Sequence, residues 1–243
     1  MSIHCELLIL VLALTLHGQV HTGKIIGGHE ADAHSRPYMV LLEGHMESGK
    51  IKRCGGFLLS EDFVMTAAHC QASSYTVKLG VHKNSKDEII QNIKVEHSFP
   101  GKDYDETNHI NDIMLLKLSS KAKLNNNVGI IALASQSDGS LPTSCQVSGW
   151  GIADRTTTYM SPVLREANVT LIDDQRCVAY NIYCSKGETG PWKGDSGGPL
   201  ICEDGKAYGV VSFNFTPAPE GPTIHSYTKI PEYRSWIDLI MEI

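Results

Sequence analysis

Three short segments carry residues that could together perform nucleophilic catalysis. His69 lies in the sequence TAAHC, Asp112 begins the run DIMLL, and Ser196 lies in GDSGGPL. A serine hydroxyl is a weak nucleophile at neutral pH, so it needs an imidazole to take its proton and a carboxylate to hold that imidazole in the right tautomer. Glycines beside the serine let backbone N–H groups approach a developing oxyanion. The three segments therefore predict acyl-transfer chemistry.

Each segment has a simpler interpretation when it is taken alone. A histidine beside a cysteine is usually structural, an aspartate before an apolar run often starts a strand, and G-x-S-x-G also marks the nucleophile elbow of α/β-hydrolases. The order of the segments separates these options, because an α/β-hydrolase carries its acid and its histidine after the serine and a helix directly behind it. Here the histidine and the acid come first, and Gly-Gly-Pro-Leu is a poor start for a helix.

The segments that must position these residues are predicted to be β-strands. Runs rich in Val, Ile, Leu, Tyr and Thr recur at short intervals from Pro37 onward, which is typical of an all-β fold. An Asp204-Gly205 step predicts a tight hairpin, because glycine readily adopts a positive φ. The predicted strands are PYMVLL, GGFLL, FVMTAA, YTVKL, IIQNIKV, DIMLLKL, CQVSGW, NVTLI, PLIC, AYGVVSF and SYTKI.

Only the carboxyl-terminal tail has a helical pattern. Pro231 lies near the start of this tail, where its missing N–H costs nothing. One apolar face of the helix is expected to dock on the β-structure. The residues of this face recur at i, i+3, i+4 and i+7 and are Tyr233, Trp236, Ile237 and Ile240.

Length and charge narrow the classes of function. The chain has 243 residues, of which 42% are hydrophobic and 20% are charged, so it can hold one large domain or two small ones. Twenty-one basic residues against 27 acidic residues give a net charge of −6, which argues against a nucleic-acid partner. A polar stretch from Ser119 to Asn127 suggests a link between two halves.

The amino-terminal segment is typical of a secretory signal. Leu7 to Leu16 form an apolar run that is shorter than the roughly 20 residues needed to span a bilayer, and small and polar residues follow it. No basic residue precedes the run, which leaves open a buried element of a cytosolic protein. Because no other segment approaches membrane-spanning length, we expect a secreted protein without a membrane partner.

Six of the seven cysteines follow this segment. An even number in a secreted chain indicates three disulfides, which could pair in any of fifteen ways. No C-x2-C pair occurs, so the sequence gives no reason to expect a zinc site, and neither a metal nor a cofactor is expected. The six residues are Cys54, Cys70, Cys145, Cys177, Cys184 and Cys202.

Combined with IIGG at residues 25–28, the segments TAAHC, DIMLL and GDSGGPL resemble the chymotrypsin-type serine proteases. The pocket disulfide of digestive relatives is missing, with Trp192 where one of its cysteines would be, so the resemblance is closest to the granzyme and mast-cell protease group. The resemblance implies an all-β, trypsin-like fold: two antiparallel six-stranded β-barrels packed with the active site between them, plus a C-terminal α-helix. The implied units are a signal peptide with a short activation pro-segment (1–24), a first β-barrel (25–130) and a second β-barrel with the helix (131–243).

The resemblance also implies a role for each residue of the three segments. His69 would be the general base and then the general acid, Asp112 would stay ionised and orient it, and Ser196 would be the nucleophile. The N–H groups of Gly194 and Ser196 would form the oxyanion hole, and Ser212 would contact the Asp112 carboxylate.

The disulfides are implied in the same way. The last of the three pairs would close a shorter loop than in relatives, which shortens one rim of the substrate cleft. The implied pairs are Cys54 with Cys70, Cys145 with Cys202, and Cys177 with Cys184.

The junction of Lys24 and Ile25 resembles the activation site of this family. Cleavage there would free the amino group of Ile25, and the new ammonium would pair with Asp195 and order the oxyanion hole. Signal cleavage after Thr22 would leave the dipeptide Gly23-Lys24 for a dipeptidyl peptidase. Earlier signal cleavage would leave a longer pro-segment for a trypsin-like activating protease.

The resemblance further implies which residues bind the side chain before the cut. Gly190 stands where trypsin-like relatives carry an aspartate, so cleavage after Lys or Arg is not expected. Asn214 and His225 replace the glycines of wide-pocket relatives, so both side chains are expected to project into the pocket. This leaves three interpretations: a narrow pocket for small residues, a pocket in which His225 and Lys193 favour an acidic residue at lower pH, or a His225 that only lines the wall. The implied substrate-binding residues are Gly190, Lys193, Ser212, Phe213, Asn214 and His225.

We therefore expect a secreted serine endopeptidase that prefers small or acidic residues before the cut. The alternative is a catalytically silent secreted homologue that acts as a binding protein. The expected partners are protein or peptide substrates, an activating protease or dipeptidyl peptidase, and serpin-type inhibitors. The chain is expected to be a monomer that reaches the extracellular space, including by way of secretory granules. Asn168 lies in a glycosylation sequon, whereas the formal sequon at Asn214 is expected to stay unused because that residue should line the cleft.

Overall fold

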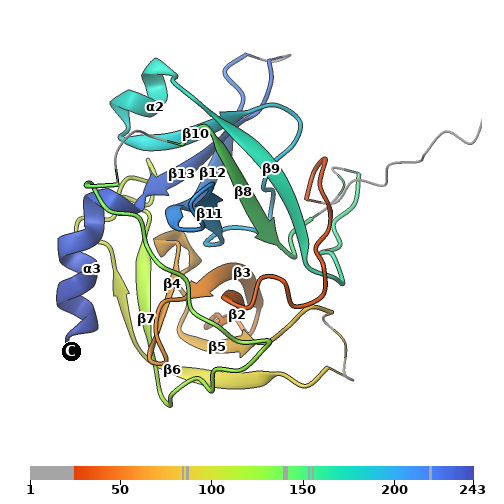
Figure 1. Ribbon diagram of the computed structural model, residues 1–243, viewed down its shortest axis with the longest axis vertical. Helices are drawn as coiled ribbons and strands as arrows, with labels where there is room; N and C mark the ends of the chain where they lie inside the picture. The colour runs from red at the N-terminus through yellow and green to blue at the C-terminus, as the bar shows by residue number, and fades with distance from the viewer. Residues whose placement is uncertain are drawn as a thin grey trace, which may run out of the picture.

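Strands dominate the computed structural model, which describes residues 25–83, 85, 88–138, 142–152, 154, 156–218 and 221–243. They form two closed barrels, one in the lower half and one in the upper half of Figure 1. The signal peptide and activation segment expected at residues 1–24 lies outside the described residues.

The first barrel closes in the order β2-β3-β4-β7-β6-β5. In β5 the side chains of Tyr75, Val77 and Leu79 point inward, because alternate residues of a strand face opposite sides. Strands β4 and β7 are buried almost throughout, as their continuous apolar sequences predict. The strands are β2 (Met39–His45), β3 (Ile51–Leu58), β4 (Phe63–Thr66), β5 (Ser74–Leu79), β6 (Gln91–Pro100) and β7 (Met114–Leu118).

The second barrel closes because β9 pairs with both β8 and β10. Strand β9 alternates in the expected way, with Ala167, Val169 and Leu171 buried and Asn168 and Thr170 exposed. The strands are β8 (Ser144–Gly149), β9 (Arg165–Ile172), β10 (Ile182–Lys186), β11 (Pro199–Cys202), β12 (Ala207–Phe215) and β13 (Ile224–Lys229).

The expected fold class is confirmed: two six-stranded antiparallel barrels and a short C-terminal helix. Every predicted run overlaps a strand, whereas β10 and the two-residue β1 (His29–Glu30) were not predicted. The expectation that only the tail is helical was wrong, because α2 (Gln175–Ala179) is a second helix among the described residues. It is too short to show a periodic pattern, and it is N-capped by Asp174, which accepts a hydrogen bond from the Arg176 amide at 3.0 Å.

The tail helix α3 (Arg234–Met241) follows a 3₁₀ turn, η2 (Ile230–Tyr233), that contains Pro231. It lies beside β7 at the left of Figure 1. Ile237 is fully buried in the apolar cluster that also holds the side chains of β4 and β7. Lys117 of β7 donates a hydrogen bond to the last carbonyl of the chain, that of Ile243, at 3.1 Å. The helix therefore docks on the first barrel, although it follows the second in sequence.

The first described residues pack against the second barrel, although they precede the first barrel in sequence. Ile25 is buried in the apolar cluster of the second barrel, and β1 pairs with β9 of that barrel. Residues 25–30, assigned with the first barrel in the sequence analysis, thus lie on the second. Each end of the described part of the chain therefore packs against the barrel that is farther from it in sequence.

The hairpin and the disulfide framework agree with expectation. Gly205 has φ +76° and its N–H donates to the carbonyl of Cys202 at 2.9 Å, which closes the turn between β11 and β12. All three implied disulfides are present: Cys54–Cys70, Cys145–Cys202 and Cys177–Cys184.

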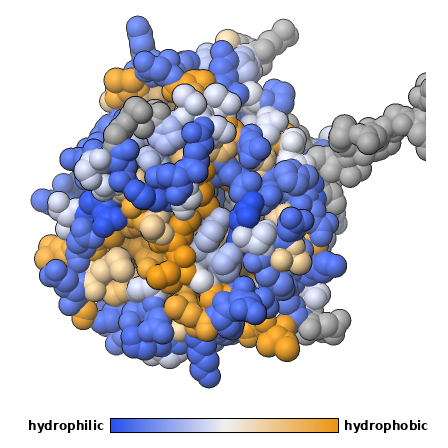
Figure 2. Space-filling view, viewed as in Figure 1, coloured by the Kyte–Doolittle hydropathy of each residue, from blue (hydrophilic) through white to orange (hydrophobic). Residues whose placement is uncertain are grey.

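The surface is unevenly polar. Figure 2 shows that on this face hydrophobic side chains gather near the middle, whereas hydrophilic ones cover most of the periphery. Apolar surface thus reaches the outside near the meeting of the two barrels in this view, while hydrophilic residues surround it.

Candidate active site

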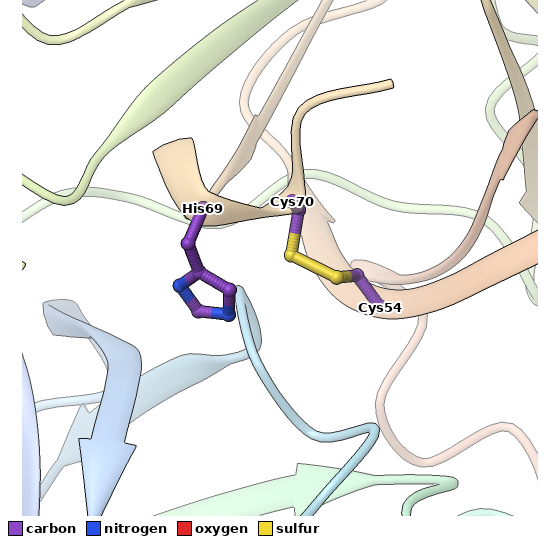
Figure 3. Close-up of side chains that lie close together, drawn as sticks. All are labelled: Cys54, His69 and Cys70. Carbon is purple, nitrogen blue, oxygen red and sulfur yellow. A yellow bond between two sulfur atoms is a disulfide. The ribbon is translucent and has the colours of Figure 1, made fainter. Parts of the chain in front are cut away.

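His69 is positioned by the turn that follows β4. It lies in the 3₁₀ turn η1 (Ala68–Cys70), and the Cys54–Cys70 disulfide ties this turn to β3. Figure 3 shows the His69 ring beside that disulfide. Both neighbours of His69 in the turn are buried, so the backbone that carries the ring is anchored in the first barrel.

Asp112 holds the His69 ring in one orientation. Its Oδ2 accepts a hydrogen bond from His69 Nδ1 at 2.7 Å, and its Oδ1 accepts one from the His69 backbone N–H at 2.8 Å. The carboxylate is fully buried, just before β7. Burial alone would raise the pKa of Asp112, but the hydrogen bonds from His69 and Ser212 outweigh it, so the pKa lies below its ordinary value. The carboxylate is therefore ionised at neutral pH.

The second barrel also contacts this carboxylate. Pairing between β12 and β13 shifts register between Val211 and Asn214, and this bulge turns Ser212 toward Asp112. Ser212 Oγ donates to Oδ2 of Asp112, and Thr228 Oγ1 donates to the Asp112 backbone carbonyl at 2.9 Å. The orientation of the His69 imidazole thus depends on both barrels.

Ser196 is held against the same part of the first barrel. Its carbonyl accepts a hydrogen bond from the Gly55 N–H at 2.7 Å, and Gly55 adjoins the disulfide that ends beside His69. The next residue, Gly197, has φ +84°, and a side chain there would collide with Thr66 Oγ1. A glycine is required because this turn passes so close to β4, the strand that leads to His69.

Two backbone N–H groups beside Ser196 are available to an anion. Gly194 has φ +99°. The carbonyl of Lys193 accepts a hydrogen bond from the Ile152 N–H at 2.7 Å, and in a planar peptide this turns the Gly194 N–H the opposite way. Neither the Gly194 nor the Ser196 N–H donates to another residue in the described part of the chain. The arrangement can therefore stabilise negative charge on a substrate oxygen.

Asp195 is buried next to this turn. Its oxygens accept hydrogen bonds from the Gly151 N–H at 2.7 Å and the Trp192 N–H at 2.9 Å. Burial raises the pKa of Asp195 to about 6, against an ordinary value of 3.8. Ile25 is also buried, at 1% exposure, and the adjoining Ile26 forms a β-bridge with Gly190.

A cavity of about 250 Å³ lies beside Ser196. It contains four of the six implied substrate-binding residues, together with Trp192 and Val211, which sequence reasoning did not assign to it. The residues that line it are Trp192, Lys193, Ser196, Val211, Ser212, Phe213 and Asn214.

Gly190 and His225, the other two implied substrate-binding residues, do not line the cavity. His225 is fully buried, and a Cβ added to Gly190 would lie 2.7 Å from its ring. The two ring nitrogens lie 3.1 Å from Asn214 Oδ1 and 3.1 Å from the Gly187 carbonyl oxygen. The expectation that His225 projects into the pocket is therefore corrected, because its ring lies behind Asn214. The Asn214 amide in turn donates to the Pro191 carbonyl at 2.9 Å.

Sequence reasoning also missed His109, which lies in the loop between β6 and β7. Its ring meets the His69 ring edge-on, with centroids 5.6 Å apart, and stacks on Phe213, with centroids 5.2 Å apart. The only local signal is that His109 precedes Asp112 by three residues. The stacking partner is distant in sequence, so no local pattern could find the contact.

In the part of the chain that the structure describes, two groups of side chains are close enough together to be tested as metal ligands. The group of Cys54, His69 and Cys70, drawn in Figure 3, does not fit, because its two sulfur atoms are bonded to each other and neither can become a thiolate. The other group consists of His69, His109 and Asp112.

The family model described as Trypsin matches residues 25–237, which is most of the chain. The chain belongs to the trypsin family of serine endopeptidases. Within this family it is 40% identical to Granzyme B of Rattus norvegicus over 250 residues, which cover 98% of this chain and 99% of that protein. It is also 40% identical to Mast cell protease 3 of Ovis aries over 247 residues, which cover 96% of each chain.

A solved structure described as "Structure of GrC" superimposes with a TM-score of 0.80. The two chains are 35% identical, and the match covers 89% of this chain and 99% of the other. The resemblance to the granzyme and mast-cell protease group, inferred from Trp192 and the missing pocket disulfide, is therefore confirmed.

Proposed function

We propose that this serine protease is secreted and that its catalytic machinery consists of His69, Asp112 and Ser196 with the N–H groups of Gly194 and Ser196. The observation that carries the assignment is the double hydrogen bond between His69 and Asp112, from the ring at 2.7 Å and from the backbone at 2.8 Å. This contact presents the opposite ring nitrogen of His69 as a proton acceptor. No cofactor is needed for this chemistry.

In the proposed mechanism, Ser196 Oγ attacks the peptide carbonyl carbon and His69 takes the hydroxyl proton. The carbonyl oxygen becomes an oxyanion that accepts hydrogen bonds from Gly194 and Ser196. His69 then gives its proton to the leaving amine, and the C–N bond breaks to leave an acyl-enzyme. A water molecule repeats the sequence on the ester, which releases the acid product and restores the serine hydroxyl.

Activation is proposed to follow cleavage after Lys24. Ile25 and Asp195 are both buried beside the second barrel, and a buried carboxylate is most stable next to a cation. The ammonium group created at Ile25 can provide that cation. Either a dipeptidyl peptidase or a trypsin-like protease would be the activating partner, and serpin-type inhibitors are expected to recognise the active form.

The pocket geometry favours small residues before the cut. The His225 ring occupies the space against Gly190, and the Asn214 side chain lines the cavity in front of it. Both ring nitrogens of His225 face carbonyl oxygens within the protein rather than the cavity. Among the described residues that line the cavity, Lys193 is then the only charged one, and it is exposed, so we propose a small-residue preference over an acidic one.

Removal of the His225 ring is expected to let larger side chains enter the pocket. In His225→Gly the space beside Gly190 opens. The kcat/KM for peptides with phenylalanine before the cut, divided by that for peptides with alanine there, will therefore rise by at least about tenfold. This is the size of effect that one or two methylenes have in a pocket. Peptide kinetics measure the ratio, and thermal unfolding checks that the variant is folded. His97→Gly, which replaces an exposed histidine, is the control. An unchanged ratio in folded His225→Gly, or dominant wild-type cleavage after Asp or Glu, contradicts the proposed pocket.

Exposure to a diverse peptide library tests the function itself. Chain produced with Ile25 as its free first residue is incubated beside the Ser196→Ala variant, and products are identified by mass spectrometry. Cuts that vanish in the variant support the endopeptidase, and the residue before each cut reports the pocket. Absence of cuts in a folded chain with all three disulfides favours the alternative, a silent homologue that binds other proteins.

Secretion is supported by the apolar run Leu7 to Leu16 and by the disulfides, which form in oxidising compartments. No helix in the described ranges has the length and hydrophobicity to cross a membrane. Release of a monomer from secretory granules is proposed from the kinship with granzymes and mast cell proteases. Asn168 is exposed on β9 and can carry a glycan, whereas the Asn214 amide is already bonded to the Pro191 carbonyl.

A further inference from the structure

His109 is a second imidazole in the active site that the proposed reaction does not use. Its ring lies nearly perpendicular to the His69 ring and stacks on Phe213, which lines the cavity beside Ser196. Candidate ligand atoms of His69, His109 and Asp112 all lie within 4.8 Å of one another. Two imidazoles this close, on the wall of an open cleft, can share a metal ion.

The Asp112 carboxylate prepares His69 to bind a metal. Metal-binding histidines almost always donate their second ring N–H to a carboxylate or carbonyl, which fixes the tautomer and raises the basicity of the ligating nitrogen. His69 Nδ1 donates to Asp112 in this way, so Nε2 carries the free lone pair. Asp112 is fully buried and already accepts hydrogen bonds from His69 and Ser212, so it acts behind the ligand rather than on the metal.

His109 has a nitrogen that lacks a partner. Its Nδ1 is buried and forms no hydrogen bond among the described residues. A buried polar atom without a partner costs free energy. Its backbone has φ +52°, in the left-handed region, and is held by the loop that leads to Asp112. Metal coordination would supply the missing partner.

We infer that His69 and His109 form a zinc site that reversibly inhibits the protease. Imidazole suits Zn²⁺, whereas Mg²⁺ and Ca²⁺ prefer oxygen ligands. Tetrahedral zinc with bonds of about 2.0–2.1 Å needs its two nitrogens roughly 3.3 Å apart, so the proposed site requires the His109 ring to turn on Phe213 toward His69 Nε2. Water completes the coordination. The metal would occupy the lone pair of His69 that takes the proton of Ser196, so hydrolysis stops until the metal leaves.

Binding can be measured without catalysis. Isothermal titration calorimetry of the Ser196→Ala variant with zinc chloride alone will show one zinc site. When His109→Gln is added to this variant, the affinity for zinc will fall by at least about tenfold. His69→Gln, added to the Ser196→Ala variant, will lower the affinity for zinc by a similar factor. His97→Gln is the matched control, since His97 is an exposed histidine on β6, and it will leave the affinity unchanged. Thermal unfolding without metal verifies that each variant is folded.

Inhibition is measured on the active enzyme with Ser196 intact. Zn²⁺ will lower the rate, excess chelator will restore it, and Mg²⁺ will have no effect. Each enzyme's rate is expressed relative to its own rate without metal. The Zn²⁺ concentration that halves this rate will be at least about tenfold higher for His109→Gln than for wild type. The site is refuted if folded His109→Gln binds zinc as the parent does, or if the Ser196→Ala parent binds none. The inhibition rests on the proposed catalytic role of His69, but the calorimetry does not, so failure of the protease assignment and failure of the zinc site are distinguishable.

Discussion

Replacing Asp112 with asparagine will lower kcat by about four orders of magnitude while the chain stays folded, the size expected when a Ser-His-Asp triad is locked in the wrong tautomer. The carboxylate accepts hydrogen bonds on both oxygens, from the ring and the backbone of His69. An asparagine has only one oxygen, so its NH₂ must face one of these donors. If the NH₂ faces the ring, Nδ1 must act as acceptor and the proton moves to Nε2, which can then no longer accept the proton of Ser196.

Ser212→Ala is the matched control for this substitution. It removes one donor to Asp112 but leaves the carboxylate and the His69 contact in place, so kcat is expected to fall only about ten- to a hundredfold. Steady-state kinetics on small peptide esters and amides measure both variants, with KM as a check that substrate binding persists. A loss of less than about tenfold in Asp112→Asn would show that this carboxylate does not set the tautomer.

The sequence predicted best those features whose signals are local. His69, Asp112 and Ser196 each lie in a short segment of distinctive composition, and the apolar runs around them mark their strands. Burial explains why these runs could be predicted: β4 and β7 are buried almost throughout, and buried residues alternate with less buried ones along β5 and along β9 from Ala167 to Leu171. The pairing of β4 with β7 inside the first barrel then brings His69 Nδ1 within 2.7 Å of the Asp112 carboxylate.

The specificity pocket could not be predicted in the same way. His225 was expected to project into the cavity because it replaces a glycine of wide-pocket relatives. Its position is decided instead by the Gly187 carbonyl and by the Asn214 side chain, both of which lie 3.1 Å from the ring. The identity of a residue gives the volume of its side chain. It does not give the hydrogen bonds that place the His225 ring behind the pocket wall.

Contacts between residues that are far apart in sequence could not be predicted. The helical pattern near Ile237 gave the existence of α3 but not its partner, since the apolar face meets β4 and β7 of the first barrel. The contact of His109 with Phe213 likewise joins a loop and a strand, β12, that are far apart in sequence. Short elements were missed for a different reason, because five-residue α2 and β10 offer too few residues for a periodic signal.

The effect of Asp195→Asn on stability will reverse sign when the chain is cleaved after Lys24. Before cleavage, Ile25 has no free ammonium group, and burial raises the pKa of Asp195 to about 6 from 3.8. The folded state then holds the proton more tightly than the unfolded state, so stability falls as the pH rises from 3.8 to 6. The full penalty at neutral pH is at most about 3 kcal/mol. Uncleaved Asp195→Asn is therefore expected to be more stable than wild type at pH 7.5, with little difference at pH 3.5.

After cleavage the same substitution will destabilise the chain by about 3–5 kcal/mol and abolish activity, because it leaves the buried ammonium of Ile25 without its counter-charge. An α-amino group has an ordinary pKa of roughly 7.7–8.0, and pairing raises it in the folded state. The pair therefore stabilises the cleaved enzyme below that range, and the stability is lost as the pH rises through the raised pKa. Urea unfolding of both forms at pH 3.5 and 7.5, with exposed Asp103→Asn as control, measures the reversal. Destabilisation of equal size in both forms at pH 7.5 would mean that Asp195 only caps its turn through Gly151 and Trp192, and that cleavage creates no buried ion pair.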